Sequence, residues 1–465
     1  MNVSPGIDRT GTDEALRVAY PFDGSIVGEV RAMSSSEATA VTEQARRFRS
    51  DLSAHERSAL LAATADDVEA RTEVFARSIT LESGLALRDA RAEVQRAVGN
   101  LRVCAEEAKQ IRGETTTTDT TATGTRRMAV TWREPVGVVL AITPFNRPLN
   151  QVVVKVGPAI AANNTVVVKP SEKTPLTALL LVETLLACGM PAEMLTVVTG
   201  RPEEVGDALV MSPHVDMVTF TGSAAVGASI AGKVGMVRTL FELGDSGSIV
   251  VLADADLEAA ADATARGAFA SSGQSCRGVK RVIVEESVAD ELVELVTERA
   301  AALRVGNPLQ GGIDLGTMID EEAARLVEAR IDAAVAAGAE LVFGGQRRGA
   351  QMWPAVIDRV RPDDDLVREE TFGPCAPVLR VAGAEEAFAC VNATRFGLQA
   401  GLFTNRLDRA MEAARRFDVG TIVLNDGPQF DSPAIPFGGV KASGLGREGP
   451  RYAIHEMTQL KTLVL

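Results

Sequence analysis

Histidine and cysteine are scarce in this chain of 465 residues, and their scarcity argues against several kinds of site. The three histidines, His55, His214 and His455, stand isolated, so we expect no metal site and few candidates for a histidine-based triad. We predict structural or surface roles for all three. The cysteines include no C-x-x-C pair, which suits a reducing compartment; they are Cys104, Cys188, Cys276, Cys375 and Cys390.

Long apolar runs and concentrations of basic charge are also missing. No run approaches about 18 uninterrupted apolar residues, and residues 1–17 lack the basic start and apolar stretch of a secretion signal. The net charge of -14 is spread along the chain, without a basic stripe that would predict nucleic-acid binding. We therefore expect a cytoplasmic protein with neither a nucleic acid nor a membrane as partner.

From residue 136 onward, short β-branched runs alternate with helical patterns. VGVVLAI at 136–142 and TVVVK at 165–169 have the continuous apolar character of strands buried on both faces. A second alternating series begins with SIVVLA at 248. This alternation predicts two α/β units, each with a parallel sheet between layers of helices.

A threonine-rich stretch at residues 113–127 precedes the first of these units. Its composition is compatible with a disordered connector. However, it leads into MAVTW at 128–132, and β-branched residues favour an extended hairpin. We expect the hairpin.

Two carboxylates, Glu242 and Asp245, lie in the sequence FELGDSGS at the join of the two units. Clefts between domains are common ligand sites, so the pair is a candidate acid/base or metal-binding pair. Equally, one of the two can stand where the backbone needs to turn. The spacing alone does not decide, because it means one face of a helix but opposite sides of a strand.

Two strand ends carry residues suited to a nucleotide. In VDMVTFTGSAAVG at 215–227, a strand, a turn with Ser223 and a helix start would present free N–H groups to phosphate oxygens. Lys169 and Glu172 follow another buried run, where an acidic side chain can accept ribose hydroxyls. Strand–glycine–helix turns and solvated turns are common, so each feature also has an ordinary structural interpretation.

Two further residues are candidates for nucleophilic chemistry. Cys276 follows the break of an alanine-rich helix near Gly273, in a polar setting that would favour a reactive thiolate. Asn146 follows a strand, and a buried asparagine amide is a good donor to an oxyanion. The alternatives are a buried, inert cysteine and a turn-forming asparagine before Pro148.

Taken together, these features resemble the aldehyde dehydrogenase superfamily over residues 15–465. The resemblance rests on the motifs ITPFN, VVVKPSEKTP, VTFTGS, FELG, SSGQSC, EETFGP and IPFGGVKASGLGREG. It implies an α/β fold with three parts. These are a Rossmann-type cofactor domain (1–112 and 136–243), an α/β catalytic domain (244–432) and a small β oligomerisation extension (113–135 and 433–465).

The resemblance gives three residues catalytic roles. Cys276 matches the nucleophile, which forms a thiohemiacetal and then a thioester, and Asn146 matches the oxyanion donor. Glu242 matches the base that activates water for thioester hydrolysis. Relatives that transfer the acyl group to coenzyme A typically lack this glutamate, so a free acid is the expected product. A catalytically silent binding or structural protein on the same scaffold is the alternative from another class.

The resemblance also implies NAD as cofactor, with NADP as the second candidate. Glu172 would repel a 2′-phosphate, although Lys169 and Ser171 would soften that preference. The ribose, pyrophosphate and nicotinamide contacts would come from motif positions along the cofactor domain and the EETFGP loop. They are Ile142, Phe145, Lys169, Ser171, Glu172, Gly206, Phe220, Ser223, Val226, Leu243, Glu370 and Phe372.

The motif details are most similar to the dehydrogenases of lactaldehyde, glyceraldehyde 3-phosphate and phosphonoacetaldehyde. We expect a small anionic aldehyde, with phosphonate and phosphate compounds first, because an arginine fork suits such groups. A neutral short-chain hydroxyaldehyde such as lactaldehyde is the alternative. Against an anion, Asp426 and Asp431 would repel it if they point inward, and Ser275 stands where arginine often does. The candidate substrate contacts are Arg96, Arg147, Ser275, Arg277 and Phe437.

Two more expectations follow from the resemblance. Edge strands in the extension need a partner, which implies a homodimer or homotetramer. The family pattern has a glycine at position 245, and aspartate tolerates positive φ better than most residues. We therefore predict that Asp245 is a turn residue.

Overall fold

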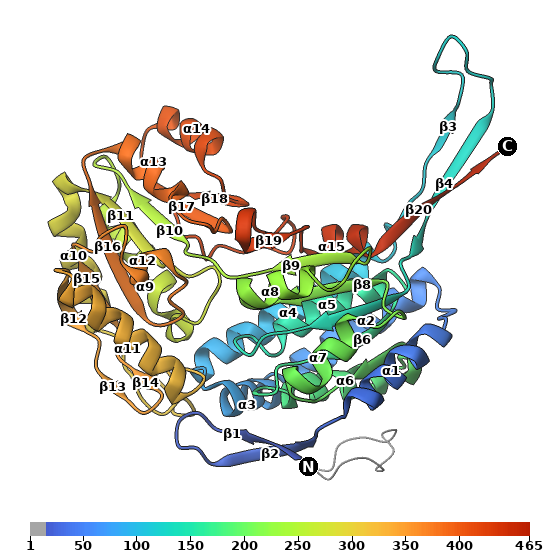
Figure 1. The fold of residues 1–465 in the computed structure, drawn as a ribbon, viewed down its shortest axis with the longest axis horizontal. Helices are drawn as coiled ribbons and strands as arrows, with labels where there is room; N and C mark the ends of the chain where they lie inside the picture. Colours follow the sequence, from blue (N-terminus) through green and yellow to red (C-terminus); the bar gives the residue numbers. More distant parts are fainter. Residues whose placement is uncertain (1–14) are drawn as a thin grey trace.

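The computed structural model describes residues 15–465, so the expectations for residues 1–14 lie outside the described residues. Two parallel sheets, each covered by helices, lie side by side (Figure 1). The first has the order β19-β9-β8-β5-β6-β7, in which only β19 is antiparallel to its neighbour. Its strands are β5 (Val138–Ile142), β6 (Thr165–Lys169), β7 (Leu195–Val197), β8 (Met217–Thr221), β9 (Arg238–Glu242) and β19 (Gly444–Leu445).

Successive residues of the first sheet enter two different cores, as the apolar runs predicted. Val139 and Ala141 pack on one face of β5, whereas Val138 and Leu140 pack on the other. Helices cover both faces, which is why these strands carry no polar alternation. They are α1 (Ser35–Arg47), α2 (Ala54–Ala70), α3 (Thr72–Ser83), α4 (Leu87–Glu107), α5 (Asn150–Ala161), α6 (Leu176–Ala187), α7 (Pro202–Val210), α8 (Ala224–Ala231) and α15 (Pro450–Glu456).

The second sheet has the order β12-β15-β16-β11-β10-β17-β18, and only its edge strand β12 is antiparallel. Its strands are β10 (Ser248–Val251), β11 (Arg281–Glu285), β12 (Glu340–Gly344), β15 (Ala355–Asp358), β16 (Cys375–Val381), β17 (Gln399–Phe403) and β18 (Thr421–Leu424). The helices of this part are α9 (Leu257–Phe269), α10 (Glu286–Ala301), α11 (Glu321–Ala336), α12 (Asp365–Arg368), α13 (Ala384–Asn392) and α14 (Leu407–Arg416). The expected α/β fold is confirmed.

A third, smaller sheet extends from the first part (Figure 1). It consists of β3 (Thr115–Thr117), β4 (Met128–Pro135) and β20 (Thr458–Val464) in the order β20-β4-β3. The threonine-rich stretch therefore leads into a hairpin rather than a free connector. Leu460 and Leu463 are 60% and 50% exposed on this sheet, so it presents apolar side chains to its surroundings.

The extension is shorter than the range 433–465 suggested. Ala453, Ile454 and Met457 are buried in the core of the first sheet, and β19 pairs with β9. Of this terminal range, only β20 pairs with β4. The amphipathic pattern of α15 explains the difference, because its apolar side chains need the core that lies beneath the first sheet.

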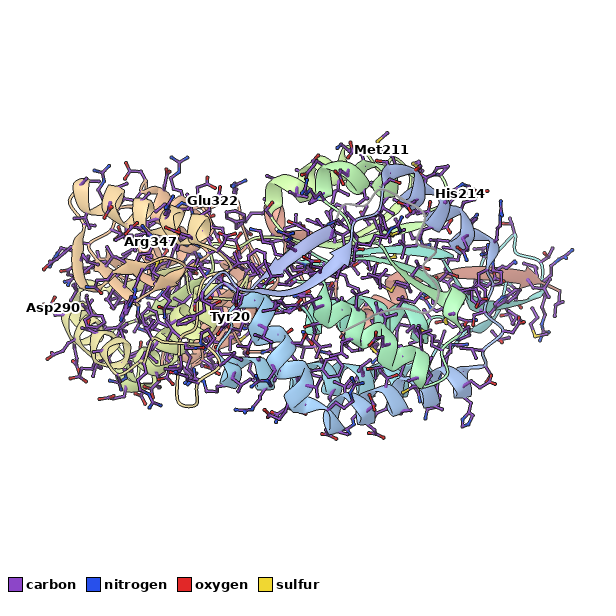
Figure 2. The ribbon with its side chains drawn as sticks, turned by 90° about the horizontal axis from the view of Figure 1, so that it is seen from below. Tyr20, Met211, His214, Asp290, Glu322 and Arg347 are labelled. Carbon is purple, nitrogen blue, oxygen red and sulfur yellow. The ribbon has the colours of Figure 1, made fainter. Side chains whose placement is uncertain are left out.

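The two large parts meet along a border that several segments cross (Figure 2). One hairpin consists of β1 (Ala15–Ala19) and β2 (Ile26–Arg31). Tyr20 lies in the connection between these strands, and its hydroxyl donates to Asn307 at 2.8 Å. His214 lies at the far side of the first part in Figure 2, away from this border. A small hairpin, β13 (Arg347–Arg348) and β14 (Gln351–Met352), lies in the second part.

Among residues 15–465, no helix combines the length and the apolar character that crossing a membrane requires.

Candidate active site

The strand order of the first sheet defines where a ligand can enter. The chain passes from β5 to β6 and β7, then returns to β8 and β9 on the other side of β5. The loops after β5 and β8 therefore diverge, and ligands of doubly wound sheets bind at such a switch point. A cavity of about 610 Å³ lies there. Its lining includes Phe145, Asn146, Ser223, Leu243, Cys276, Glu370 and Phe372.

The start of α8 offers a phosphate site. Ser223 is the N-cap, and its Oγ accepts the N–H of Val226 at 3.3 Å. Gly222 and Ser223 line the cavity, so the free N–H groups of the first helical turn lie beside it. Gly227 is required by close packing, since a Cβ there would lie 2.5 Å from Leu243. These features fit the pyrophosphate of a dinucleotide.

The end of β6 offers polar groups for a ribose. Lys169 is 4% exposed, and burial lowers its pKa. Its Nζ lies 3.6 Å from the Glu172 carboxylate and donates to the Pro170 carbonyl at 3.3 Å. Because an ammonium group has three donors, the side chain retains capacity for a further acceptor. Ser171 lies between the two charged residues and accepts the N–H of Lys173.

The other predicted cofactor contacts lie on strands β5 and β8 and on helices α7 and α8 of the first part. Ile142 ends β5, and Phe220 packs edge-on against Phe241 with the ring centroids 6.1 Å apart. Val226 is 48% exposed on α8, and Gly206 lies within α7. None of these four side chains lines the described cavity.

The opposite end of the cavity suits a nicotinamide. Phe145 and Phe372 form an edge-to-face pair with centroids 6.1 Å apart. Glu370 accepts the backbone N–H of Asp245 at 3.2 Å, and burial raises its pKa to about 7. Gly244 allows this approach, since a Cβ there would lie 2.3 Å from the Glu370 carboxylate.

Backbone conformation, close packing and a buried lysine fix the loop that presents Cys276. Ser271 and Ser272 have φ values of 56° and 53°, and Gly273 has 69°. Only glycine fits at position 273, because a Cβ would lie 2.0 Å from the Gly373 carbonyl oxygen. The buried Lys280 ammonium donates to the Gly273 carbonyl at 2.5 Å. The helix before the loop ends at Phe269, earlier than the break expected near Gly273.

Cys276 lines the cavity beside Asn146. Burial raises the pKa of the Cys276 thiol to about 12, and the positive charge of Arg277 opposes this shift. The Asn146 amide donates to the Gln274 carbonyl at 3.0 Å, which leaves one amide hydrogen for another acceptor. The Gln274 side chain is itself fixed by the N–H of Ile319 at 2.8 Å. The thiol is therefore neutral at rest, on a firmly positioned loop.

Glu242 ends β9 and is 2% exposed. Neither carboxylate oxygen has a hydrogen-bond partner within residues 15–465. Burial and the negative charge of Glu448 raise its pKa well above the ordinary value. Unpartnered buried carboxylates are costly, and functional sites are where they persist.

Two residues behind Glu242 were missed by the sequence reasoning. Lys155 of α5 is fully buried, and its Nζ lies 2.6 Å from the Glu448 carboxylate. The same ammonium donates to Thr219 of β8 at 3.2 Å. The signal was a single lysine inside the apolar sequence QVVVKVGPAI. Its partner lies 293 residues away, so the pairing was invisible in the sequence.

Asp245 is not the turn residue that we predicted, because its φ is not positive. Its carboxylate is 2% exposed and accepts the backbone N–H groups of Leu398 and Gln399 at 3.2 and 3.3 Å. The Ser443 hydroxyl lies 3.4 Å from the same carboxylate. Burial raises the pKa of Asp245 to about 6, while the cation of Arg281 opposes the shift. Asp245 therefore joins the segment after β9 to the start of β17.

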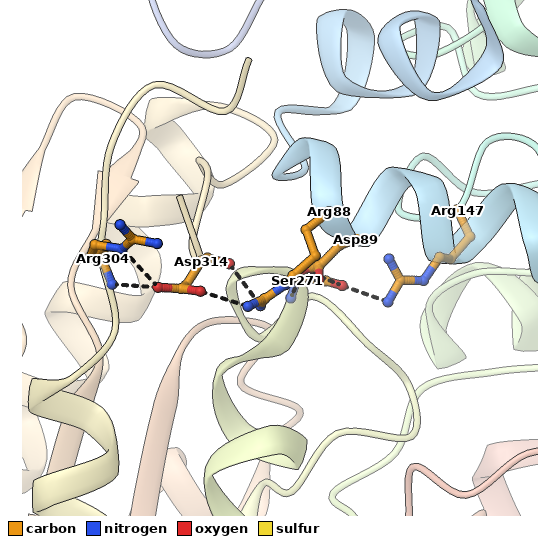
Figure 3. A network of polar contacts seen from close by, with 6 residues as sticks. All are labelled: Arg88, Asp89, Arg147, Ser271, Arg304 and Asp314. Atoms are coloured by element: carbon orange, nitrogen blue, oxygen red, sulfur yellow. Dashed lines mark hydrogen bonds and ion pairs between the residues drawn. The ribbon is translucent and has the colours of Figure 1, made fainter. Parts of the chain in front are cut away.

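Arg147 connects the two large parts rather than facing the cavity (Figure 3). Its guanidinium donates to the Ser271 hydroxyl at 2.6 Å, and the Ser271 N–H donates to Asp89 at 2.9 Å. The network continues beside it, where Arg88 contacts Asp314 at 2.6 Å. Arg147 thus supports the loop before Cys276 from behind.

The other predicted substrate contacts are grouped around Arg277, which directly follows Cys276, and like Arg147 they do not line the described cavity. The Arg277 guanidinium lies 5.4 Å from the Phe437 ring centroid, and the Arg277 N–H donates to Ser275 Oγ at 3.3 Å. Arg96 of α4 lies opposite, with its Nε 3.3 Å from Asp431. Asp431 therefore does point toward the arginines. Asp426 instead pairs with Arg266 at 2.8 Å.

The switch-point cavity, the phosphate-accepting helix start and the cysteine beside it are the features of a dinucleotide-dependent enzyme with a thiol nucleophile. The chain belongs to the aldehyde dehydrogenase family, whose sequence pattern matches residues 8–463. The resemblance indicated by the motifs is therefore confirmed. The protein is an NAD(P)-dependent aldehyde dehydrogenase.

Characterised relatives and solved structures extend over nearly the whole chain. A 3-sulfolactaldehyde dehydrogenase of Priestia aryabhattai is 39% identical over 98% of this chain and 95% of its own. Aspartate-semialdehyde dehydrogenase 1 of Pseudomonas canavaninivorans is 40% identical over 97% of this chain and 96% of its own. The NADP complex of the NADP-dependent glyceraldehyde-3-phosphate dehydrogenase of Bacillus halodurans C-125 has a TM-score of 0.95 at 38% identity, covering 97% and 96% of the two chains.

Proposed function

We propose that the protein oxidises a short anionic aldehyde to its carboxylic acid. The observation that carries this proposal is the pair of guanidinium groups near the nucleophile: Arg277 directly follows Cys276 and acts on its thiol, and Arg96 lies next to Arg277 across Asp431. Guanidinium groups bind carboxylate, sulfonate and phosphate oxygens strongly where water is scarce. The two relatives named above act, by their names, on aldehydes that bear a sulfonate or a carboxylate.

The Cys276 thiol would release its proton to solvent water, and the resulting thiolate would attack the aldehyde carbon. The thiohemiacetal oxygen would accept hydrogen bonds from the free hydrogen of the Asn146 amide and from the backbone N–H of Cys276. The bound nicotinamide supplies the hydride acceptor, and the residues that would hold it are Phe145, Glu370, Phe372 and Leu243. The product of this step is a thioester on Cys276.

Glu242 would then activate the water that hydrolyses the thioester. Its raised pKa makes it a stronger base than an ordinary carboxylate, and its unpartnered oxygens are free to accept a proton from water. Lys155 and Glu448 lie behind it, and their charges act on Glu242 in opposite directions. We propose that this pair adjusts the basicity of Glu242 through its charges.

NAD is the cofactor that the end of β6 favours. The Glu172 carboxylate would lie beside the ribose, where it would repel a 2′-phosphate. The Lys169 ammonium at 3.6 Å compensates part of that charge, so NADP remains usable. Comparing kcat/KM for the two cofactors, with Glu172→Gln as the matched variant, tests this point. The variant should shift the preference toward NADP.

The arrangement of the chain supports three further proposals. We infer a cofactor domain built on the first sheet and a catalytic domain built on the second. The exposed Leu460 and Leu463 of β20 suit burial between subunits of a homodimer or homotetramer. The scattered free cysteines suit a reducing cytoplasm.

An aldehyde panel tests the proposed activity. Steady-state rates with sulfoacetaldehyde, succinic semialdehyde, glyceraldehyde 3-phosphate and lactaldehyde should show the highest kcat/KM for anionic compounds. Addition of coenzyme A should leave the rate unchanged, because Glu242 serves hydrolysis. A clear preference for neutral lactaldehyde would overturn the anionic assignment and favour the alternative function.

A further inference from the structure

Asp431 stands between the two arginines that the proposed function uses. Its Oδ1 lies 3.1 Å from Nη1 of Arg277, and its Oδ2 lies 3.3 Å from Nε of Arg96. The side chains of Arg277, Asp431 and Arg96 are only 11%, 27% and 33% exposed, so solvent screens their charges incompletely. The Arg277 guanidinium also donates to the Phe430 carbonyl at 3.3 Å, which holds the Asp431 loop against it.

The charges in this cluster do not cancel. Two guanidinium groups face one carboxylate, which leaves one positive charge in excess. Burial lowers the pKa of Arg96 to about 10, and the neighbouring cations Arg277 and Arg147 act in the same direction. Arg147 does not change this count, because the buried Glu93 carboxylate lies near it and adds an opposite charge, and both charges act on Arg96.

We propose that Asp431 is a specificity-determining residue that restricts the site to aldehydes with a single negative charge, such as a sulfonate or a carboxylate. This inference rests on the proposed function, since it concerns the anionic group of that substrate. A monoanion neutralises the one excess positive charge. A dianionic phosphate or phosphonate would leave a surplus negative charge beside Asp431, where repulsion is poorly screened.

This inference changes the expected order of substrates. The sequence placed phosphonate and phosphate compounds first because of the arginines, and it did not show whether Asp431 points toward them. With Asp431 directed at both arginines, sulfonates and carboxylates come before them. The site would thus discriminate among anions by charge rather than only between anionic and neutral aldehydes.

Sulfoacetaldehyde and phosphonoacetaldehyde form a suitable pair of probes, because they differ mainly in the charge of the anionic group. At about pH 8.5 a phosphonate, like a phosphate monoester, carries close to two negative charges. We expect the wild-type enzyme to prefer the sulfonate in kcat/KM by at least about tenfold. Asp431→Asn should reduce that preference by at least about tenfold, mainly through a lower KM for the phosphonate.

Two further variants make the experiment decisive. Asp426→Asn is the matched control, because Asp426 lies in the same loop but pairs with Arg266, and it should keep the wild-type ratio. Asp431→Glu should also keep the ratio, because it restores the charge. An unchanged ratio in Asp431→Asn, or an equal loss for both compounds, would overturn the role of Asp431. A wild-type preference for lactaldehyde over both compounds would instead overturn the proposed function.

Discussion

Glu242 and Asp245 lie three positions apart, and each is 2% exposed, yet their surroundings differ completely. The Asp245 carboxylate accepts two backbone N–H groups at the start of β17 and lies near a serine hydroxyl. The Glu242 oxygens have no such partner among the described residues. Buried polar groups are normally satisfied, so the difference separates a carboxylate that joins two segments of the fold from the one that we propose as the hydrolytic base.

Among the predicted variants, the one that removes the basic group of Glu242 should have the largest effect on kcat. Glu242→Gln keeps the size of the side chain but cannot activate water, so we expect kcat to fall by about 10²- to 10⁴-fold. The first turnover should still produce about one reduced cofactor per active site. Stopped-flow absorbance of the reduced nicotinamide measures both quantities. A steady rate close to wild type would show that Glu242 is not the hydrolytic base.

The residues behind Glu242 should contribute less. Glu448→Gln removes the negative charge that raises the pKa of Glu242, and it leaves the buried Lys155 without its counterion. We expect kcat to fall by about tenfold, with the pH at half-maximal kcat moving to lower pH. The pH profile of kcat is the measurement. An unchanged midpoint would mean that Glu448 does not act on Glu242.

Asp245 should affect stability more than catalysis. Asp245→Gly removes the acceptor of two backbone N–H groups and leaves the buried Arg281 cation uncompensated, so the free energy of unfolding should fall by about 2–4 kcal/mol. We expect kcat to stay within a few-fold of wild type. Urea denaturation and steady-state kinetics measure the two effects. A large loss of kcat without a loss of stability would give Asp245 a catalytic role.

The smallest effect that we predict is a dependence of the free energy of unfolding on pH. Folding raises the pKa of Asp245 from 3.8 to about 6, so the folded state favours the neutral acid. The wild-type free energy of unfolding, relative to that of Asp245→Asn, should therefore decrease by about 2 kcal/mol as pH rises from about 4 to about 6. Above that range the difference should be constant. Chemical denaturation of both proteins at several pH values tests this sign, and an increase would contradict it.

Local patterns were sufficient for the main features of this protein. The two α/β units followed from apolar runs, since strands buried on both faces show little polar alternation. Motifs at strand ends and loops singled out Cys276 and Asn146, which line the cavity, and Glu242, whose role stays a prediction. The sequence did not reveal those features that depend on contacts between distant segments. The role of Asp245 required knowing that residues 398–399 lie against it, and the Lys155–Glu448 pair joins residues that are 293 positions apart in the sequence.

The roles of the arginines also depended on contacts that the sequence does not show. Their number near the nucleophile indicated an anionic substrate, but only the fold shows which of them are already engaged. Arg147 is committed to Ser271, whereas Arg96 and Arg277 share Asp431. The direction of an aspartate side chain within a loop depends on such tertiary contacts, which spacing in the sequence does not encode.

The central claim is that Cys276 carries an acyl group that Glu242 removes. Intact-protein mass spectrometry of Glu242→Gln, after incubation with succinic semialdehyde and NAD, tests it most directly. We predict a mass increase equal to one acyl group, located on the peptide that contains Cys276, and its absence in Cys276→Ser with Glu242→Gln. An unmodified Cys276 in Glu242→Gln, despite formation of reduced cofactor, would contradict the account.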